Sequence, residues 1–527
     1  MYKKIKIPLF AAVLCMVAAC SPDLINPDQD QFPKHTEGAH LGNKIDNPYS
    51  MNNMRQALAN LHQSGLISSI QQIAPTHLYV KLTPQDSAEL NRILEDTSLN
   101  LFPYPLDYEL EGEGPYMAPA GSESDIYTVV PIEHDMTGIP HVVLEECFIP
   151  EEEDPDLARL ELESMRLTGC ISDEEIQMLM MDETKGLWKK PRGQVTVENT
   201  TENMTEGVSG VKVLVSWCVK IASCYADNEG NFRINRGYLF DVHYFAVFRN
   251  REGYSIYSNW GPILPAIHHV GRHDRRGHNI HIGTGSQAWP WATINNAAHI
   301  FYNEMCDGYQ ITKPHSNLRF WYWNAEKESY TGAAPMLHHI ALSAAELALI
   351  LTVVEPTAGL ITTGALLALS QLLPDIIIYQ QERTTEQYYK TVFHEMSHAA
   401  HYRAVGPLYW TSFIYQICAN YFSDGSSYGS KPEENNGVVG VGEMWAYYFD
   451  YKCREKQFGD ATIFQTHRWF KPQILKEIEE RTNITAGDIF QALPIDVYDH
   501  EDLKQRMKSL YGYEDIIDDC FSLMDSK

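Results

Sequence analysis

The chain predicts a multidomain α+β protein with an N-terminal α/β region, a small β-sandwich and a mainly helical C-terminal domain. Its 527 residues exceed several-fold the roughly 150 residues of an average domain. Hydrophobic residues make up 44% of the chain and charged residues 21%, which allows a large buried core and excludes a mainly disordered protein. Residues 191–258 read as strands separated by Gly, Asn and Asp turns, whereas helical patterns dominate near the C-terminus.

The net charge argues against one class of partner. There are 41 Lys and Arg residues against 69 Asp and Glu residues, which gives a formal net charge of -28 at pH 7. Because so negative a surface repels phosphate backbones, we expect no nucleic-acid partner. The charge otherwise indicates only that the protein is well solvated.

Residues 1–19 have the features of a secretion signal. Lysines make the start basic, and residues 8–19 carry no charge over a length too short for a comfortable bilayer span. The segment ends in Val-Ala-Ala-Cys at residues 17–20, which resembles a bacterial lipobox. The resemblance implies cleavage before Cys20, lipidation of its thiol, and a lipoprotein anchored in the bacterial cell envelope, at the outer membrane or cell surface. The alternative is an ordinary cleaved signal that ends beside an incidental Cys.

The segment 20–50 is polar and contains prolines, which predicts a tether, and residues 51–188 are predicted to form the N-terminal α/β region. The acidic stretch from Glu145 onward is expected to be a solvated helix or loop. The sequence THLYVKLTPQDSAEL, followed by LFPYPLDYEL, resembles the N-terminal region of large secreted lipoproteins of Bacteroidota-type bacteria. The elements expected here are a helix over 51–72, a strand over 77–82 and a helix over 84–95.

Residues 190–258 are predicted to form the small β-sandwich. The turn residues at 227–230 predict a tight turn ahead of Phe232, and no complete calcium-binding loop follows them. The stretches GVSGVKVLVSW and ADNEGNFR resemble the carboxypeptidase-regulatory or transthyretin-like β-sandwich, and the resemblance implies a spacer module. Strands are expected over 194–197, 211–215 and 238–240.

Two segments of the C-terminal domain have unusual compositions. The histidines between 268 and 281 lie in a polar stretch with Gly and Arg, for which we favour a basic loop over a metal site. Residues 341–378 are largely apolar, and we expect a buried helical hairpin there. A transmembrane helix and an exposed apolar flap are the two alternatives.

The motif His-Glu-Met-Ser-His at residues 394–398 carries the chemistry. On a helix, residues four apart lie on one face, so His394 and His398 can direct their imidazoles at one ion. Glu395 lies one step around the helix, where it can act as general base toward a zinc-bound water. Burying these three polar groups without a cation is costly, so the pattern predicts a Zn²⁺ site.

A third ligand is needed, and we predict Glu443, in the first turn of a helix expected to start at Gly442. Ala446 on the same face permits the close approach of two helices. HExxH completed by a Glu on a second helix resembles the gluzincin arrangement. The competing third ligands are Asp424, Glu433 and Glu434, and His401 on the same helix is disfavoured.

The gluzincin resemblance implies a zincin-like catalytic domain over residues 260–527. It makes His394, His398 and Glu443 the zinc ligands and Glu395 the base, in a metallopeptidase that hydrolyses peptide bonds of protein or peptide substrates. Asp450 is a candidate for an orienting group. The alternative is a non-catalytic surface-binding lipoprotein with a structural or degenerate zinc site. The sequence leaves open which tyrosine stabilises the oxyanion: Tyr402, Tyr409, Tyr428, Tyr447 or Tyr448.

Overall fold

The structure is a computed structural model. It shows a mixed α/β protein with several β-sheets and a C-terminal helical region. The residues that it describes are 38–525, apart from 86, 118–124, 152–153, 182–186, 259–263, 324–331, 341–372, 381–382, 425–427, 429–435 and 460–468. The predicted signal peptide 1–19 and the lipidation site Cys20 lie outside the described residues.

The helices have the following bounds: α2 Met51–Gln63, α3 Ser87–Glu95, α4 Pro155–Leu167, α5 Asp173–Met181, α6 Trp289–Ile300, η2 Phe301–Met305, α7 Cys306–Tyr309, η3 Leu337–His339, α10 Thr385–Asp424, α11 Gly437–Phe458, α12 Gln473–Arg481, α13 Ala486–Gln491, α14 His500–Tyr511, α15 Glu514–Phe521 and η5 Ser522–Asp525. The strands are β1 His40–Lys44, β2 His77–Leu82, β3 Tyr108–Glu111, β4 Ile126–Pro131, β5 His141–Cys147, β6 Arg192–Asn199, β7 Met204–Gly207, β8 Val211–Trp217, β9 Lys220–Tyr225, β10 Asn231–Arg233, β11 Val242–Asn250, β12 Ser255–Ser258, β13 Ile267–His273, β14 Ile280–Ile282, β15 Arg319–Trp323, β16 Gly332–Ala333 and β17 Ile376–Tyr379.

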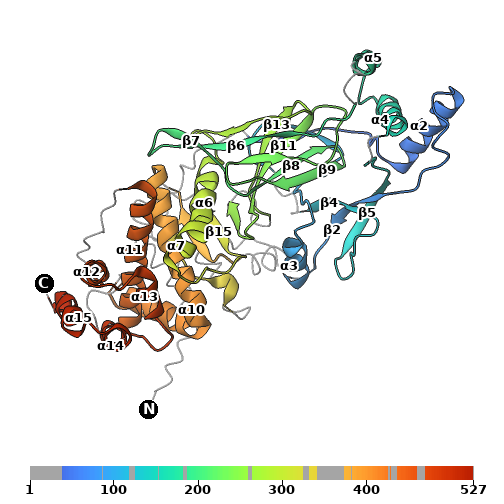
Figure 1. Cartoon of the computed structure of the whole chain (residues 1–527). Helices are drawn as coiled ribbons and strands as arrows, with labels where there is room; N and C mark the ends of the chain where they lie inside the picture. The colour runs from blue at the N-terminus through green and yellow to red at the C-terminus, as the bar shows by residue number, and fades with distance from the viewer. Residues whose placement is uncertain are drawn as a thin grey trace, which may run out of the picture.

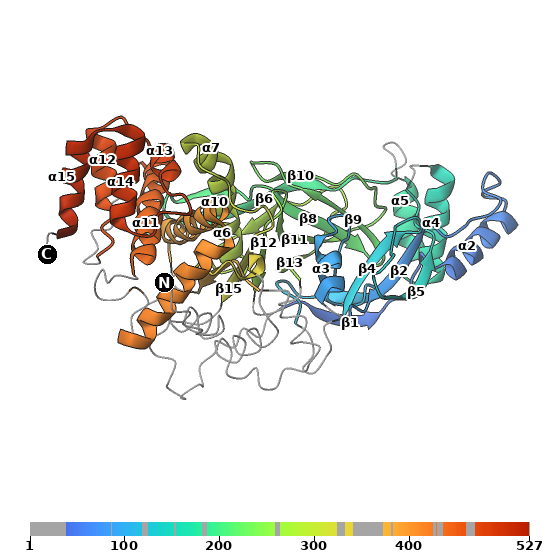
Figure 2. The ribbon, with the colours of Figure 1, turned by 90° about the horizontal axis from the view of Figure 1, so that it is seen from below.

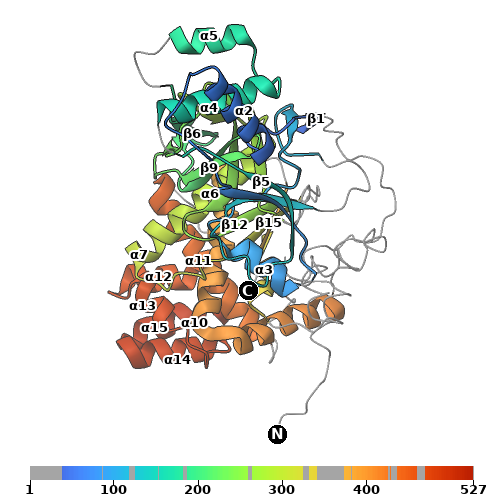
Figure 3. The same cartoon turned by 90° about the vertical axis from the view of Figure 1, so that its right-hand side faces the viewer.

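The strands lie between two helical ends (Figure 1). Helices α2, α4 and α5 form one end, and α10 to α15 form the other, an arrangement that persists in the view from below (Figure 2). Figure 3 views the molecule from the end that carries α2 and α4. No helix among the described residues is both long enough and apolar enough to span a membrane.

The N-terminal region is built on the antiparallel sheet β4-β2-β5, and α2 packs against α4. The predicted strand over 77–82 and helix over 84–95 are confirmed as β2 and α3. The helix predicted over 51–72 is too long, because the chain leaves α2 at Gln63 and turns at Gly65, whose φ is 68°. The tether prediction is wrong for residues 40–44, since pairing of β1 with β3 satisfies their backbone hydrogen bonds.

A buried ion pair joins α4 to β9. Lys220 Nζ lies 2.8 Å from Glu161 Oε1, and both side chains are 1% exposed. The same carboxylate accepts hydrogen bonds from the Tyr49 hydroxyl at 2.6 Å and from the Trp188 indole N–H at 2.9 Å. The prediction of a solvated acidic segment is therefore wrong at Glu161, whose charge is paired and hydrogen-bonded inside the protein.

Two sheets occupy the middle of the molecule. In the described part of the chain, the larger follows the order β16-β17-β15-β12-β11-β8-β9 with β13 beside β11, and the smaller follows β10-β6-β14 with β7 beside β6. The strands predicted over 194–197 and 211–215 are confirmed within β6 and β8. The predicted tight turn is present as well: the backbone N–H of Gly230 donates to Asp227 O, and the φ of Gly230 is 79°.

The strand predicted over 238–240 is wrong. Tyr238 forms only an isolated bridge with Lys189, and the next strand starts at Val242. The apolar side chain of Leu239 packs instead into a small core with Trp188 and residues of α4. Leu239 is therefore apolar because it packs against a helix, and not because it belongs to a sheet.

Strand pairing crosses residue 258, the predicted end of the β-sandwich. Strand β12 pairs in parallel with β15, and β15 pairs in parallel with β17, so strands before and after this residue share one sheet. Strand β14 likewise joins β6 in the smaller sheet. Parallel pairs need long connections, which is why local sequence patterns do not reveal them.

The prediction of a His-rich basic loop is wrong for His268, His269 and His273, because they belong to β13, which pairs with β11, whereas residues 274–279 form a loop as predicted. His269 is buried, and its Nε2 lies 2.9 Å from His243 Nδ1. The other ring nitrogen, Nδ1, lies 2.7 Å from Gly112 O. The polar ring atoms are thus hydrogen-bonded inside the sheet region, which permits burial.

At the C-terminal end, Thr485 caps α13: its side chain accepts from the backbone N–H of Asp488, and the Asp488 carboxylate accepts in return from the backbone N–H of Thr485. Most of the predicted apolar hairpin, residues 341–372, lies outside the described residues. Its last part is a strand and not a helix, because Ile376–Tyr379 form β17. Its isoleucines are β-branched, and this favours a strand between two partners.

We expect Lys220→Ala to lower the free energy of unfolding by about 3–5 kcal/mol, because it leaves Glu161 buried and unpaired. The matched control is Arg166→Ala, which removes an exposed ion pair with Glu163 and should cost less than about 1 kcal/mol. The double variant Lys220→Met/Glu161→Leu should be less destabilised than Lys220→Ala. Chemical denaturation measures all three, and equal losses for Lys220→Ala and Arg166→Ala would contradict the assignment.

Acid should weaken the fold through His269. Burial lowers the pKa of His269 to about 4 from its usual 6.5. Between these values the unfolded chain binds more protons than the folded chain, so stability falls as the pH drops from 6.5 to 4. In His269→Gln the dependence of unfolding free energy on pH should become shallower by up to about 1.4 kcal/mol per pH unit. Urea denaturation across this pH range tests it, and an unchanged slope would count against the prediction.

Candidate metal centre

Helix α10 carries the HExxH residues in a buried segment. It is interrupted at Gly406, whose φ of 81° and ψ of 176° are not helical, and Pro407 follows. Beyond the interruption the chain brings aromatic rings to His398, whose ring centroid lies 5.8 Å from that of Trp410 and 5.6 Å from that of Phe413. One wall of the site is therefore aromatic and excludes water.

Helix α11 packs against α10 and carries Glu443 to the two histidines. The indole N–H of Trp445 donates to the carbonyl of Ser397 at 3.2 Å, which fixes one helix against the other. A Cβ at position 442 would lie only 2.6 Å from Phe413 Cε2, so the contact requires a glycine. Gly442 lies inside α11 and not at its start, which corrects the predicted helix start but leaves Glu443 on the predicted face.

The Glu443 carboxylate lies close to both predicted histidine ligands. His394 Nε2 lies 3.5 Å from Glu443 Oε2, and His398 Nε2 lies 3.3 Å from Glu443 Oε1. His394, Glu395 and His398 each offer one ligand atom, and these atoms lie within 4.8 Å of one another. Donors that share a tetrahedral zinc at bonds of about 2.0–2.1 Å are about 3.4 Å apart. The observed separations match that spacing.

A buried carboxylate lies behind His394. Asp450 Oδ2 is 3.7 Å from His394 Nδ1, an ion-pair contact on the side of the ring away from Glu443. Asp450 Oδ1 accepts a hydrogen bond from Arg454 Nε at 2.8 Å. This chain of contacts orients the imidazole so that Nε2 faces Glu443, as carboxylates do behind metal-binding histidines.

The local charge fits a divalent cation. With the carboxylates ionised and the imidazoles neutral, as metal binding requires, the formal charges of the buried Glu395, Glu443, Asp450 and Arg454 sum to -3 + 1 = -2. Within the described part of the chain, Glu443 Oε2 is a buried atom that has no hydrogen-bond partner. A doubly charged ion beside Glu443 would neutralise the excess and satisfy this oxygen.

The environment drives the pKa values of the two glutamates apart. Burial raises the pKa of Glu395 to about 8. Burial acts in the same direction on Glu443, but the neighbouring imidazoles of His398 and His394 outweigh it and lower its pKa to about 2. Burial lowers the pKa of His398, whereas at His394 the contacts with Asp450 and Glu443 outweigh burial and raise the pKa to about 10. Glu443 is thus the carboxylate that the imidazoles keep ionised.

Strand β16 lies against Glu395, a contact that sequence reasoning missed. A Cβ at Gly332 would lie 3.0 Å from Glu395 Oε1 and 2.8 Å from Thr391 Cγ2. Among the described strands, β16 is the last of the large sheet and pairs only with β17. The candidate base therefore lies beside a sheet edge.

The competing ligands do not join this cluster in the part of the chain that the structure describes. His401 is buried, but its ring contacts Tyr409 and Trp410, at centroid distances of 5.4 and 6.0 Å. The remaining alternatives, Glu433, Glu434 and the side chain of Asp424, lie outside the described residues and side chains.

The five candidate tyrosines differ in the groups that they contact. The ring centroid of Tyr447 lies 4.3 Å from that of His394. The hydroxyls of three others donate elsewhere: Tyr402 to His339 O, Tyr409 to Val497 O and Tyr448 to Glu479. The ring of Tyr428 lies against Phe470, at a centroid distance of 5.7 Å. Tyr447 is thus the tyrosine in contact with a predicted ligand.

The spacing of two further residues along α11 also indicates that they belong to the site. Asp450 lies seven residues after Glu443, which is two helical turns and hence the same face of α11. Arg454 lies four residues after Asp450, at the spacing of a helical ion pair. Gly332 carried no such signal, because it reaches Glu395 only through the sheet.

Substitution of the third ligand should weaken metal binding selectively. We expect Glu443→Gln to weaken Zn²⁺ binding by more than about 100-fold, and Asp450→Asn by about 10–100-fold, since the latter only orients a ligand. Glu455→Gln is a control on the same helix, because Glu455 contacts Tyr451 and Lys452 and lies away from the histidines. Competition with a chromophoric chelator gives the affinities. Unchanged affinity in Glu443→Gln would exclude Glu443 as a ligand.

Comparison with known proteins assigns no family to this geometry. No model of a known protein family matches the chain, and no curated protein matches it. The contacts of His394 and His398 with Glu443 and Asp450 therefore carry the assignment of the site.

Proposed function

We propose that the protein is a zinc-dependent metallopeptidase of gluzincin type. The observation that carries the proposal is the convergence of His394 Nε2, His398 Nε2 and the Glu443 carboxylate at separations of 3.3 and 3.5 Å. Two imidazoles and one carboxylate form a ligand set used by catalytic zinc sites, which keep a further position for water or substrate. A zinc ion held there supplies a Lewis acid for the scissile carbonyl and activates water.

Glu395 is the proposed general base. It follows His394 directly on α10, is buried, and is one of the groups whose ligand atoms lie within 4.8 Å of one another. Because it is next to a predicted ligand, its carboxylate can take a proton from the attacking water and deliver it to the leaving amine. Nearby Tyr447 is the candidate donor to the oxyanion, because its ring lies against His394.

The edge strand supports a peptide as the substrate. Strand β16 ends the described large sheet, and Gly332 lies against Glu395. An extended peptide that pairs with such an edge would run past the carboxylate that activates water. This arrangement matches protein or peptide substrates with an extended backbone.

The rival function is a non-catalytic surface-binding lipoprotein with a structural zinc site. A structural site needs a fourth protein ligand, and the ring of His401, the candidate for it, packs against Tyr409 and Trp410 instead. This observation favours the enzyme. The location in the bacterial cell envelope, through a lipid on Cys20, is part of the same proposal and rests on the lipobox-like sequence at residues 17–20.

Replacement of the base should separate turnover from metal binding. We expect Glu395→Gln to lower kcat by about 10²–10⁴-fold and to leave the zinc content unchanged, because Glu395 moves a proton but is not a ligand. A library of quenched fluorescent peptides gives the rates, and elemental analysis gives the zinc content.

The matched control for this experiment is Glu455→Gln, because Glu455 contacts Tyr451 and Lys452 and lies away from the histidines. It should keep both activity and zinc. Cleavage by Glu395→Gln at the wild-type rate would eliminate the proposed base. If the zinc-loaded wild type cleaves no peptide of the library, the binding lipoprotein is the better reading.

A further inference from the structure

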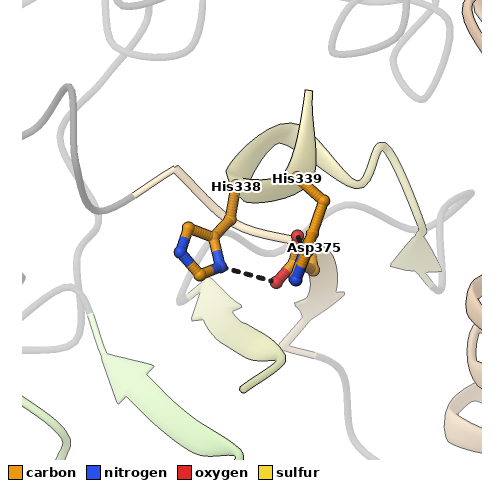
Figure 4. Close-up of side chains that lie close together, drawn as sticks. All are labelled: His338, His339 and Asp375. Atoms are coloured by element: carbon orange, nitrogen blue, oxygen red, sulfur yellow. Dashed lines mark hydrogen bonds and ion pairs between the residues drawn. The ribbon is translucent and has the colours of Figure 1, made fainter. Parts of the chain in front are cut away.

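A second group of metal-ligating side chains lies outside the HExxH site. His338 and His339 belong to η3, and Asp375 directly precedes β17 (Figure 4). Asp375 Oδ1 lies 2.8 Å from His339 Nδ1, and Asp375 Oδ2 lies 3.4 Å from His338 Nδ1. The two imidazoles thus approach the two oxygens of one carboxylate.

Asp375 carries a charge in a fully buried position, with 0% of its surface exposed. Its Oδ2 accepts the backbone N–H of Arg319 at 3.0 Å. No Lys or Arg side chain forms an ion pair with it in the part of the chain that the structure describes. Because a buried carboxylate needs a counter-charge, either imidazolium or a bound cation must supply it.

The spacing of the side chains favours a cation. His338 Nδ1 is buried and has no hydrogen-bond partner among the described residues, although Asp375 Oδ2 is only 3.4 Å away. This is the separation of two donors that share a tetrahedral ion at bonds of about 2.0–2.1 Å, about 3.4 Å. The nitrogen and the oxygen are placed to face a common ion.

His339 is also oriented as a ligand. Its Nδ1 lies at hydrogen-bond distance, 2.8 Å, from Asp375 Oδ1, and a cation bound between the two atoms takes the place of the proton that they otherwise share. Its Nε2 lies 3.1 Å from Asn317 Oδ1 and can donate an N–H to this oxygen. Metal-binding histidines use their second nitrogen in this way. The carbonyl of His339 accepts from the Tyr402 hydroxyl at 2.8 Å, which fixes the turn against α10.

We propose that His338, His339 and Asp375 form a second site, which binds a divalent transition-metal cation such as Zn²⁺. Two imidazole nitrogens and one carboxylate oxygen are the donors that Zn²⁺ prefers. The ion ties η3 to the start of β17, the strand that pairs with β16. The site is separate from His394, His398 and Glu443 and does not depend on the proposed peptidase activity.

Zinc stoichiometry tests the proposal. The protein is stripped with a chelator and then titrated with Zn²⁺, with bound metal measured by elemental analysis and affinity by calorimetry. We expect two zinc ions per chain in the wild type and one in His394→Ala/His398→Ala. Addition of His338→Gln to that variant should remove the remaining ion, with at least a 100-fold loss of affinity.

A neighbouring histidine gives the matched control. His315 stacks on His339 at a ring-centroid distance of 4.1 Å, but its ring nitrogens contact Arg403. His315→Gln should therefore keep both ions. Melting temperatures of the metal-free variants check their folding, and Zn²⁺ should raise the melting temperature of His394→Ala/His398→Ala but not that of the variant with His338→Gln added.

Should His338→Gln fail to fold, Asp375→Asn replaces it as a variant of nearly the same shape. The second site is refuted if His394→Ala/His398→Ala binds no zinc, or if His338→Gln keeps the zinc content of the wild type. Failure of the HExxH site gives a different result, because His394→Ala/His398→Ala then keeps as much zinc as the wild type.

Discussion

The structure of the candidate site depends on an excess of negative charge buried where α10 meets α11. Three carboxylates and one guanidinium lie out of water within the same region, together with two imidazoles. Such a group is unfavourable in a protein interior unless a cation or protons compensate it. The features around it are consistent with this constraint: Gly442 lets the helices approach, Trp445 fixes their contact, and the aromatic rings after Gly406 pack against His398.

The large sheet connects the two candidate metal sites. Strand β17 follows Asp375 directly and pairs with β16, which lies against Glu395. Tyr402 lies on α10, four residues after His398, and its hydroxyl donates a hydrogen bond to the carbonyl of His339. The position of the sheet edge beside Glu395 therefore depends on the same short turn that carries His338 and His339. A cation there would stiffen the edge on which an extended peptide is proposed to lie.

Local sequence patterns predicted an element correctly where the contacts that stabilise it lie within the element itself. The strands over 77–82 and 194–197 and the helix around His394 follow from the periodicity of their residues alone. The errors arose where apolar or charged residues serve a distant partner. Leu239 packs on α4 and forms no strand, Glu161 is buried by Lys220, and His269 enters a sheet through pairing with β11.

The sequence by itself determined that His394, Glu395 and His398 share one buried helix, because a four-residue spacing and apolar neighbours are properties of a single turn. It also indicated Glu443 as a partner, through the helix that contains it. Only the tertiary structure decided that the Glu443 carboxylate reaches both imidazoles, that Asp450 and Arg454 stand behind His394, and that His339 and Asp375 meet. These contacts join segments far apart in the chain, so they depend on helix packing and parallel strand pairing, which no local pattern encodes.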